Sequence, residues 1–329
     1  MNNPATALAA LTATLSLLSA CGSQGQGSVT LATQAVQPNP AGPASTAVDV
    51  AGWGGAAAGP AALYVSGGPS GLDVQRADGS HLQRLGSTPL SRLVVVNGLV
   101  VDGVAADFIV AVDPEAGRLR GFEIHAQSGA LRRIARSSGG PAGPVTSLCA
   151  WRDAEGRHRL VFTTPAPKLE EWEVSAVAGK IPGKANEIVA TPLRVSPLGF
   201  AAVDCAVDPA NGDVYLLDGE GVAYRIAADW QAPAMAQRVW ADAGMALRGI
   251  EAHRDGGTTH LLATTSDGSL AALAPDGRLL GRVELDVPAG RLAAAGGLLA
   301  LVAANGQGAR IAPLGEALRL VGVGPRPAP

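Results

Sequence analysis

Three carboxylates in the middle of the chain are the side chains best placed to bind a ligand. Asp208 begins the turn 208–213, and Asp218 and Glu220 lie in the turn that follows. Ca²⁺ prefers oxygen ligands, so two or three carboxylates on adjacent loops would hold one weakly bound ion. Asp-Pro and Asp-Gly pairs also form ordinary turns without any metal. The sequence therefore predicts either one weak Ca²⁺ site at these residues or two plain turns.

Two cations, Lys168 and Arg248, are the candidates for contact with a phosphate group. Single cations at strand ends are more commonly solvated, and that is the alternative. No serine stands in a nucleophile-elbow pattern, so we predict no catalytic residue. Because 25 Lys and Arg face 28 Asp and Glu, the net charge of −3 gives no case for a nucleic-acid partner.

The turns that carry the carboxylates separate short apolar strands. The stretch 199–226 is typical of a strand–turn–strand–turn–strand unit, because Asn211-Gly212 and Asp218-Gly219 favour tight reversals. Repetition of this unit at roughly 45-residue spacing predicts an all-β, six-bladed β-propeller with three or four antiparallel strands per blade and little helix. The segment 227–243 is expected to be a loop that leads into an outer strand. The predicted strands are 61–66, 71–76 and 81–85; 93–96, 108–112, 119–124 and 131–134; 146–151, 160–163 and 169–174; 201–207, 214–217 and 222–226; 248–253, 260–264, 269–273 and 279–285; and 292–295, 298–303, 309–313 and 317–321.

The first 60 residues are expected to lie outside the propeller. Residues 1–20 contain the apolar core of an export signal, and the sequence before Cys21 matches a bacterial lipobox, in which this cysteine is lipidated. A plain signal peptide with a chance cysteine is the alternative. Residues 21–60 are rich in Gly, Pro, Ala, Ser and Thr, which predicts a tether, and 61–324 would be the propeller. We expect an exported monomer, anchored through its lipid in the bacterial membrane at the periplasmic or outer-membrane face of the envelope.

Cys149 and Cys205 occupy corresponding positions in the first strands of neighbouring predicted blades. An exported chain with two such cysteines favours a disulfide. Inner strands of adjacent blades are usually further apart than the Cα separation of about 4.4–6.8 Å that a disulfide requires. Of these two alternatives we expect two buried thiols.

Four segments of the predicted propeller carry a family resemblance. Residues 71–85, GLDVQRADGSHLQRL, resemble the pattern GLAVYDLDGRQVQ…L, and residues 147–174 resemble GLCLYRSPTGKLYAFVND…GRVEQWEL. Residues 204–226 and 269–285 resemble GCVADDELGRLYVGEEDVGIWRY and SFAVYDRQGNYLGRFRI. These patterns belong to the bacterial β-propeller phytases, which are calcium-dependent 3-phytases that hydrolyse myo-inositol hexakisphosphate. The resemblance runs from about residue 71 to residue 314 and implies the same six-bladed fold.

The resemblance also implies an acidic central cleft, where carboxylates hold several Ca²⁺ ions and a metal-activated water attacks a phosphate. Asp208, Asp218 and Glu220 stand where the family has acids. Most of the other implied carboxylate positions carry different residues in this chain. These positions are the segment 52–63, Val94, Val203, Pro209, Ala210 and Arg248.

Three functions are compatible with this sequence. The first is a phytase-like propeller lipoprotein whose hydrolysis is weak or absent and which binds a phosphorylated or other polar small molecule. The second is a non-enzymatic module that presents a propeller face to an envelope protein. The third is an active calcium-dependent phytase with ligands at displaced positions. Six or more carboxylates converging at the central mouth would favour the third function, and two or fewer would favour the other two.

Overall fold

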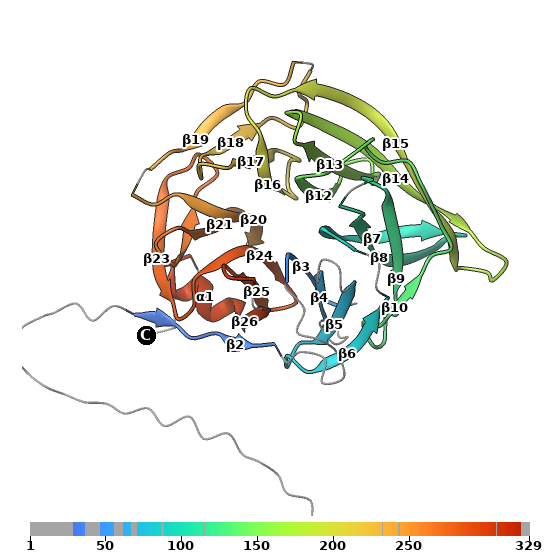
Figure 1. The fold of residues 1–329 in the computed structure, drawn as a ribbon, viewed down its shortest axis with the longest axis horizontal. Coiled ribbons are helices and arrows are strands. Elements are labelled where there is room, and N and C mark those ends of the chain that lie inside the picture. Colours follow the sequence, from blue (N-terminus) through green and yellow to red (C-terminus); the bar gives the residue numbers. More distant parts are fainter. Residues whose placement is uncertain are drawn as a thin grey trace, which may run out of the picture.

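The computed structural model describes residues 29–36, 47–55, 62–66, 71–86, 89–114, 116–231, 233–242, 244–306 and 308–323. Within these ranges the chain is almost entirely β-structure, in six small sheets that form a ring (Figure 1). The predicted six-bladed β-propeller is therefore confirmed. Cys21, the expected export signal 1–20 and much of the expected tether lie outside the described residues. No helix of the described part is long and apolar enough to cross a membrane.

Each blade is built on four antiparallel strands, and two sheets gain a further parallel strand at the outer edge. Blade 1 comprises β3 (Asp49–Trp53), β4 (Ala62–Ser66), β5 (Leu72–Arg76) and β6 (His81–Leu85). Blade 2 comprises β7 (Arg92–Val101), β8 (Val104–Val112), β9 (Leu119–Ile124) and β10 (Leu131–Arg133). Blade 3 comprises β12 (Ser147–Arg152), β13 (His158–Thr164), β14 (Lys168–Ala178) and β15 (Ala185–Pro197), with β11 (Arg136–Ser138) added in parallel.

Blade 4 comprises β16 (Ala202–Val207), β17 (Val214–Asp218), β18 (Ala223–Ile226) and β19 (Gln237–Trp240). Blade 5 comprises β20 (Leu247–Asp255), β21 (Thr258–Thr265), β22 (Ser269–Leu273) and β23 (Leu279–Leu285), with β1 (Thr30–Leu31) added in parallel. Blade 6 comprises β24 (Ala289–Ala295), β25 (Leu298–Ala303), β26 (Ala309–Pro313) and β2 (Gln34–Ala35). The six inner strands β3, β7, β12, β16, β20 and β24 contact one another around the centre of the ring.

The first turn of blade 4 shows how sequence and packing fix the connections. The Gly212 amide donates to the Asp208 carbonyl at 2.8 Å, and the Asp208 amide donates to the Asp213 carbonyl at 2.9 Å. Gly212 has a φ of 79°, in the left-handed region that glycine adopts at little cost. A Cβ at this position would lie 2.4 Å from the ring of Trp151 in blade 3. The predicted Asn-Gly turn is confirmed, and its glycine also lets two blades approach closely.

The propeller begins earlier in the chain than predicted. Strands β1, β2 and β3 fall within the range 21–60, for which a tether was expected, and they belong to blades 5, 6 and 1. Leu31 is completely buried, and the Thr33 hydroxyl donates to Asp286 at 2.6 Å. The tether prediction is therefore wrong for these strands. A low-complexity composition does not prevent a short segment from pairing with the free edge of an outer strand.

The strand predicted at 317–321 is also wrong, because α1 (Leu314–Leu320) occupies this segment. Its buried residues, Leu314, Ala317 and Leu318, recur at the spacing of one helix face and pack against blades 5 and 6. This spacing indicates a helix, and the strand prediction did not take it into account. The described part of the segment 227–236 is a loop that leads into an outer strand, as predicted, but that strand, β19, already begins at Gln237 inside the range expected to be loop.

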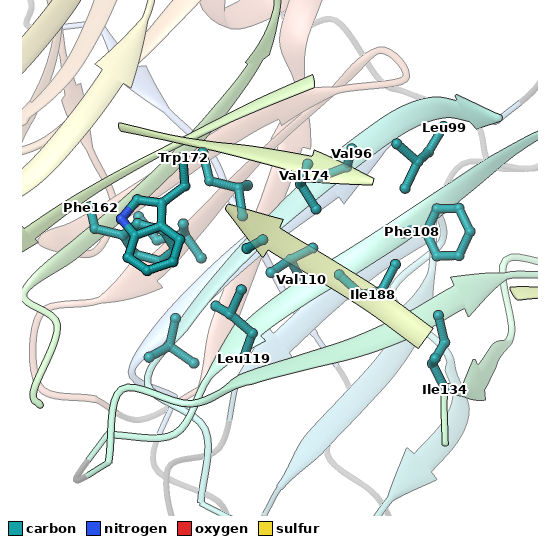
Figure 2. Close-up of a cluster of buried hydrophobic side chains, with 14 of the residues drawn as sticks. Val96, Leu99, Phe108, Val110, Leu119, Ile134, Phe162, Trp172, Val174 and Ile188 are labelled. Atoms are coloured by element: carbon teal, nitrogen blue, oxygen red, sulfur yellow. The ribbon is translucent and has the colours of Figure 1, made fainter. Parts of the chain in front are cut away.

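The cores that hold the ring together lie between neighbouring blades. Between blades 2 and 3, Phe108, Phe162 and Ile188 are completely buried with Trp172 beside them (Figure 2). Phe162 and Trp172 meet edge to face, with ring centres 6.2 Å apart, an arrangement that aromatic rings favour. Because each blade buries both of its faces, the inner strands are held in fixed positions around the centre.

Candidate functional site

The inner strands of all six blades surround a central cavity of about 240 Å³. Its walls consist mainly of backbone and small apolar side chains, and its charged residues are Asp49, Asp204, Glu251 and Arg291. These four residues come from blades 1, 4, 5 and 6. More of the exposed cavity surface is polar than apolar, because strand backbones and these charged side chains line it, and such a surface can hydrogen-bond a small polar molecule.

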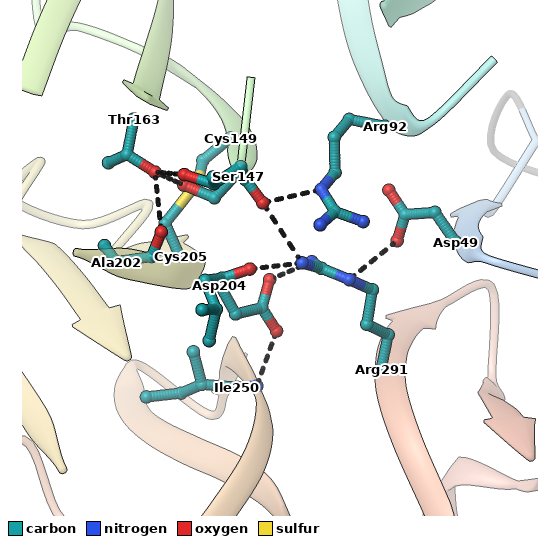
Figure 3. Close-up of a disulfide and its surroundings, with 12 residues drawn as sticks. Asp49, Arg92, Ser147, Cys149, Thr163, Ala202, Asp204, Cys205, Ile250 and Arg291 are labelled. Atoms are coloured by element: carbon teal, nitrogen blue, oxygen red, sulfur yellow. Dashed lines mark hydrogen bonds and ion pairs between the residues drawn. A yellow bond between two sulfur atoms is a disulfide. The ribbon is translucent and has the colours of Figure 1, made fainter. Parts of the chain in front are cut away.

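Arg291 of β24 lines this cavity and reaches residues of other blades (Figure 3). Its Nη1 pairs with Asp204 of blade 4, and its Nε lies 3.8 Å from Asp49 Oδ1 of blade 1. Its Nη2 donates to the carbonyl oxygens of Val203 and, at 3.3 Å, Thr146. The side chains of Arg291, Asp49 and Asp204 are only 16, 8 and 9% exposed. The paired charges of this network are therefore largely shielded from solvent.

Asp49 and Asp204 have the same role in two different blades. Asp49 Oδ2 accepts from the Leu93 amide of blade 2 at 2.9 Å, and Asp204 Oδ2 accepts from the Ile250 amide of blade 5 at 3.1 Å. Each aspartate thus connects its own inner strand to that of the next blade. Burial raises the pKa of Asp49, and the attraction of Arg291 offsets this only in part.

Arg92, the first residue of β7, brings a second guanidinium to the network. Its Nε donates to the Thr146 carbonyl at 2.7 Å, and its Nη1 donates to the Ser91 carbonyl at 3.3 Å. Burial and the neighbouring Arg291 lower the pKa of Arg92 to about 10. At neutral pH two arginines therefore stand beside two aspartates.

Glu251 of β20 is the remaining carboxyl of the cavity. It is half-buried, and the structure gives it no arginine partner among the described residues. Burial, together with the negative charges of Asp204 and Asp49, raises its pKa to about 8, although the Ala294 amide acts in the opposite direction. A carboxylic acid that stays neutral at pH 7 and faces a cavity is a frequent feature of functional sites.

A disulfide joins Cys149 of β12 to Cys205 of β16 in the cavity wall (Figure 3). The expectation of two separate buried thiols is therefore wrong. The Cα atoms lie 6.1 Å apart, within the range that a disulfide spans. Inner strands of blades 3 and 4 converge here, and a bulge between Ala202 and Asp204 shifts the register of β16 just before Cys205.

The structure does not bring Asp208 together with the other predicted metal ligands. In the pairing of β16 with β17, Val207 lies opposite Val214 and Ala202 lies opposite Asp218, so Asp208 and Asp218 are at opposite ends of blade 4. Five residues of strand separate these ends, which corresponds to roughly 16 Å. Asp208 Oδ1 accepts from the Ala210 amide and from the Thr259 hydroxyl, both at 2.8 Å. Its carboxylate thus stabilises a turn and a contact with blade 5.

Asp218 and Glu220 do share one turn. Asp218 Oδ1 accepts from the amides of Glu220 and Val222, both at 2.9 Å, and its Oδ2 accepts from the Tyr224 hydroxyl at 3.2 Å. The Glu220 side chain is exposed. The Asp218 carboxylate therefore stabilises its turn, as the turn alternative predicts. Because Asp208 lies at the other end of blade 4, the three carboxylates do not fit one shared Ca²⁺ ion.

The two predicted phosphate contacts lie in different blades. Lys168 begins β14 in blade 3, and Arg248 is the second residue of β20 in blade 5, next to a register shift. Both side chains are exposed, and among the described residues neither forms an ion pair. The structure brings neither of them into the central cavity.

The central cavity also does not fit a calcium cluster. Three carboxylates converge there, Asp49, Asp204 and Glu251. An active phytase was expected to have six or more, and a weakly hydrolytic or non-enzymatic propeller was expected to have two or fewer, so the number lies between the two expectations. Two of these carboxylates already pair with Arg291. Among the described residues, no group of three or more His, Cys, Asp or Glu side chains could hold a metal ion.

Three charged residues of the cavity, Asp49, Glu251 and Arg291, were not predicted from the sequence. Asp49 lies in the segment taken for a tether, and the other two are single charges in strands that otherwise read as apolar or small, 249–252 and 290–295. A lone charge in an inner strand was the available signal, since such a residue must find a partner across the ring.

Comparison with known proteins supports the fold. No protein family matches the sequence, and no curated protein does. A gluconolactonase from Xanthomonas campestris is similar in structure, with a TM-score of 0.50, 13% identity, and coverage of 88% of this chain and 98% of that chain. BBS1N, solved in complex with ARL6DN, has a TM-score of 0.50 and 14% identity, with coverage of 81% of this chain and 78% of that chain. At such identities these likenesses show the fold alone, a six-bladed propeller.

Proposed function

We propose that this protein is a non-hydrolytic binding propeller that takes a small polar molecule into its central cavity. The observation that carries the proposal is the pairing of Arg291 with both Asp49 and Asp204. These carboxylates are neutralised within the protein, so they are not available to hold several Ca²⁺ ions for phosphate hydrolysis. The volume of about 240 Å³ lies just below the usual range for drug-sized ligands, roughly 300–1,000 Å³, and favours a ligand of few atoms.

The resemblance to β-propeller phytases is consistent with this proposal at the level of the scaffold. The resembling segments supply strands and turns. The carboxylates of Asp208 and Asp218 accept from amides of their own turns, and the Glu220 side chain is exposed. Inositol hexakisphosphate carries six phosphates, and the arginines nearest the cavity, Arg92 and Arg291, already donate to protein oxygens. We therefore propose that phosphate-ester hydrolysis is absent or weak.

We further propose that the propeller is exported and anchored at the cell envelope through a lipid on Cys21. The support is the lipobox-like sequence 18–21 after an apolar segment. In this case Cys21→Ser leaves the protein in the soluble fraction or as an uncleaved precursor, and the unchanged protein partitions into membranes. Equal partitioning of the two proteins would contradict the anchor.

The binding function is tested by calorimetry on the folded propeller with glycerol, D-glucose and myo-inositol as uncharged probes. Phosphate release from inositol hexakisphosphate is measured in parallel with Ca²⁺ present. The proposal expects binding of at least one probe and no phosphate release. Binding must also be lost when the cavity is filled by Asn97→Trp at an exposed lining residue, a variant whose folding is checked by circular dichroism. Phosphate release with Ca²⁺, or failure of all three probes to bind, would contradict it.

A further inference from the structure

Glu251 is the one cavity carboxyl that the internal network leaves unpaired in the described part of the chain. Asp49 and Asp204 connect neighbouring strands and bind Arg291, so both are used by the protein itself. Glu251 likewise accepts from an amide of the next inner strand, that of Ala294 in β24, but among the described residues it has no arginine partner. Its free hydrogen-bonding capacity is therefore directed at whatever occupies the cavity.

The groups around Glu251 come from every inner strand. Strand β3 presents Asp49, β16 presents Asp204 and β24 presents Arg291. Strand β7 contributes Arg92 at its start and the uncharged Asn97, and β12 contributes the disulfide-bonded Cys149. The two arginines balance the two aspartates. An ionised Glu251 would add a negative charge with no partner in a confined cavity, which is unfavourable.

We propose that Glu251 selects the ligand of the central cavity: as a neutral carboxylic acid it donates a hydrogen bond to an oxygen of a small uncharged molecule. This inference rests on the proposed binding function and names its ligand class. An anionic ligand would find no free cation among the described residues of the cavity, because Arg92 and Arg291 already donate to protein oxygens. A cationic ligand would find Asp49 and Asp204 already paired with Arg291. A compact polyol or sugar presents oxygens that accept from the acid and hydroxyls that donate to Asn97 and to backbone carbonyls of the wall.

The cavity geometry also predicts how binding depends on pH. The raised pKa of Glu251, about 8, means that the carboxyl keeps its proton at neutral pH and loses it in mildly alkaline solution. Loss of the proton removes the donor and places a negative charge against the ligand oxygen. Affinity should then fall about tenfold for each pH unit above the pKa.

The test compares the unchanged protein with Glu251→Gln and Glu251→Ala, using calorimetry at about pH 6.5 and about pH 9.5, on either side of this pKa. The probes are D-glucose, D-glucuronate and D-glucosamine, which share one ring and differ in charge. We expect glucose to bind best at the lower pH and at least about tenfold more weakly at the higher pH. Glu251→Gln, which keeps a donor that cannot ionise, should bind at both pH values, and Glu251→Ala should lose binding.

An infrared difference spectrum of the unchanged protein minus Glu251→Gln provides a readout that needs no ligand. The band of the protonated carboxyl should persist to about pH 8, and its disappearance near the ordinary pKa of 4.5 would overturn the inference. If sugar binding does not change with pH or with either substitution, the inference about Glu251 is wrong and the proposed binding function still holds. Absence of sugar binding in a protein that keeps the band would instead contradict the proposed function and the ligand class together.

Discussion

Arg291 pairs with Asp204 across an intervening blade. Arg291 belongs to β24 in blade 6 and Asp204 to β16 in blade 4, so the pair joins two blades that are not neighbours (Figure 3). The intervening strand β20 packs tightly against β24 at Gly249, where a Cβ would lie 2.5 Å from the Gly290 carbonyl and 2.9 Å from the Arg291 Cα. The glycine is required for close approach of two inner strands. One side chain thereby ties together blades that are far apart in sequence.

We predict that Arg291→Met destabilises the propeller by about 3–5 kcal/mol, because it leaves Asp49 and Asp204 buried without their cation. The free energy of unfolding in urea measures the effect. The control is Arg282→Met, which removes an exposed pair with Asp267 and should cost less than about 1 kcal/mol. Adding Asp204→Asn to Arg291→Met should recover part of the loss. Equal, small effects of both arginine substitutions would show that the central network does not hold the ring.

The disulfide between Cys149 and Cys205 encloses a long loop, since the two cysteines are 56 residues apart. Cross-linking such a loop restricts the unfolded chain, and we expect the bond to contribute about 2–4 kcal/mol. Thermal unfolding with and without a reductant measures this contribution. A variant with both cysteines changed to serine is the control, because it should match the reduced protein and not respond to reductant. If the reductant still destabilises this variant, its effect does not come from the disulfide between Cys149 and Cys205.

The fold was predictable because its signals are local. Turns such as Asn211-Gly212 and apolar runs of strand length lie next to one another in sequence, and their repetition indicates blades. The strands β1 and β2 were not predictable in this way. Two-residue strands carry no period, and they form only because an outer strand of blade 5 or 6 offers a free edge.

The site was far less predictable, because it depends on closure of the ring. Asp49 and Arg291 lie at opposite ends of the chain and meet only when blade 6 packs against blade 1. The acids that the sequence did highlight, Asp208 and Asp218, have local partners at two and four residues. Asp208 and Asp218, which stand out in the sequence, therefore stabilise their own turns. The carboxylates that line the cavity do not stand out in the sequence.

Glu251→Gln should change the pH dependence of stability in a defined direction. The folded state holds the Glu251 proton up to about pH 8, whereas the unfolded chain releases it near 4.5. Between these values the folded state binds more protons, so this group makes stability fall as pH rises. We expect Glu251→Gln to flatten the decline and to be more stable by about 1–2 kcal/mol near pH 8, since the cavity is open to water. Urea unfolding across this pH range measures it. Parallel profiles for the two proteins would contradict the raised pKa.

Leu31→Ala tests whether the N-terminal strands belong to the propeller. Leu31 is completely buried in the core of blades 5 and 6, so the substitution should cost about 2–4 kcal/mol. Val29→Ala is the matched control, because Val29 is 60% exposed two residues earlier and should change stability by less than about 0.5 kcal/mol. Thermal unfolding of both variants gives the comparison. If Leu31→Ala does not reduce stability, this segment does not belong to the folded propeller and acts as the expected tether.

Calcium ions should stabilise this protein only slightly. A metal that binds only the folded state stabilises it by RT ln(1 + [L]/Kd), about 2.7 kcal/mol per site at a hundredfold excess over Kd. Several sites, as in an active β-propeller phytase, would therefore raise the melting temperature by many degrees. In this chain Asp208 and Asp218 lie at opposite ends of blade 4, and Asp49 and Asp204 are bound to Arg291. At most one weak site near Asp218 and Glu220 is compatible with this arrangement.

We accordingly expect about 5 mM Ca²⁺, in the range of weak extracellular sites, to shift the melting temperature by about 3 °C or less. Inositol hexakisphosphate should release no phosphate under the same conditions. Asp218→Asn controls for the weak site, because any small shift should disappear in this variant if the turn binds the ion. A magnesium salt at equal ionic strength controls for screening of surface charges. A large shift specific to Ca²⁺, accompanied by phosphate release, would mean that a set of metal ligands forms outside the central network and that the protein is an active phosphohydrolase.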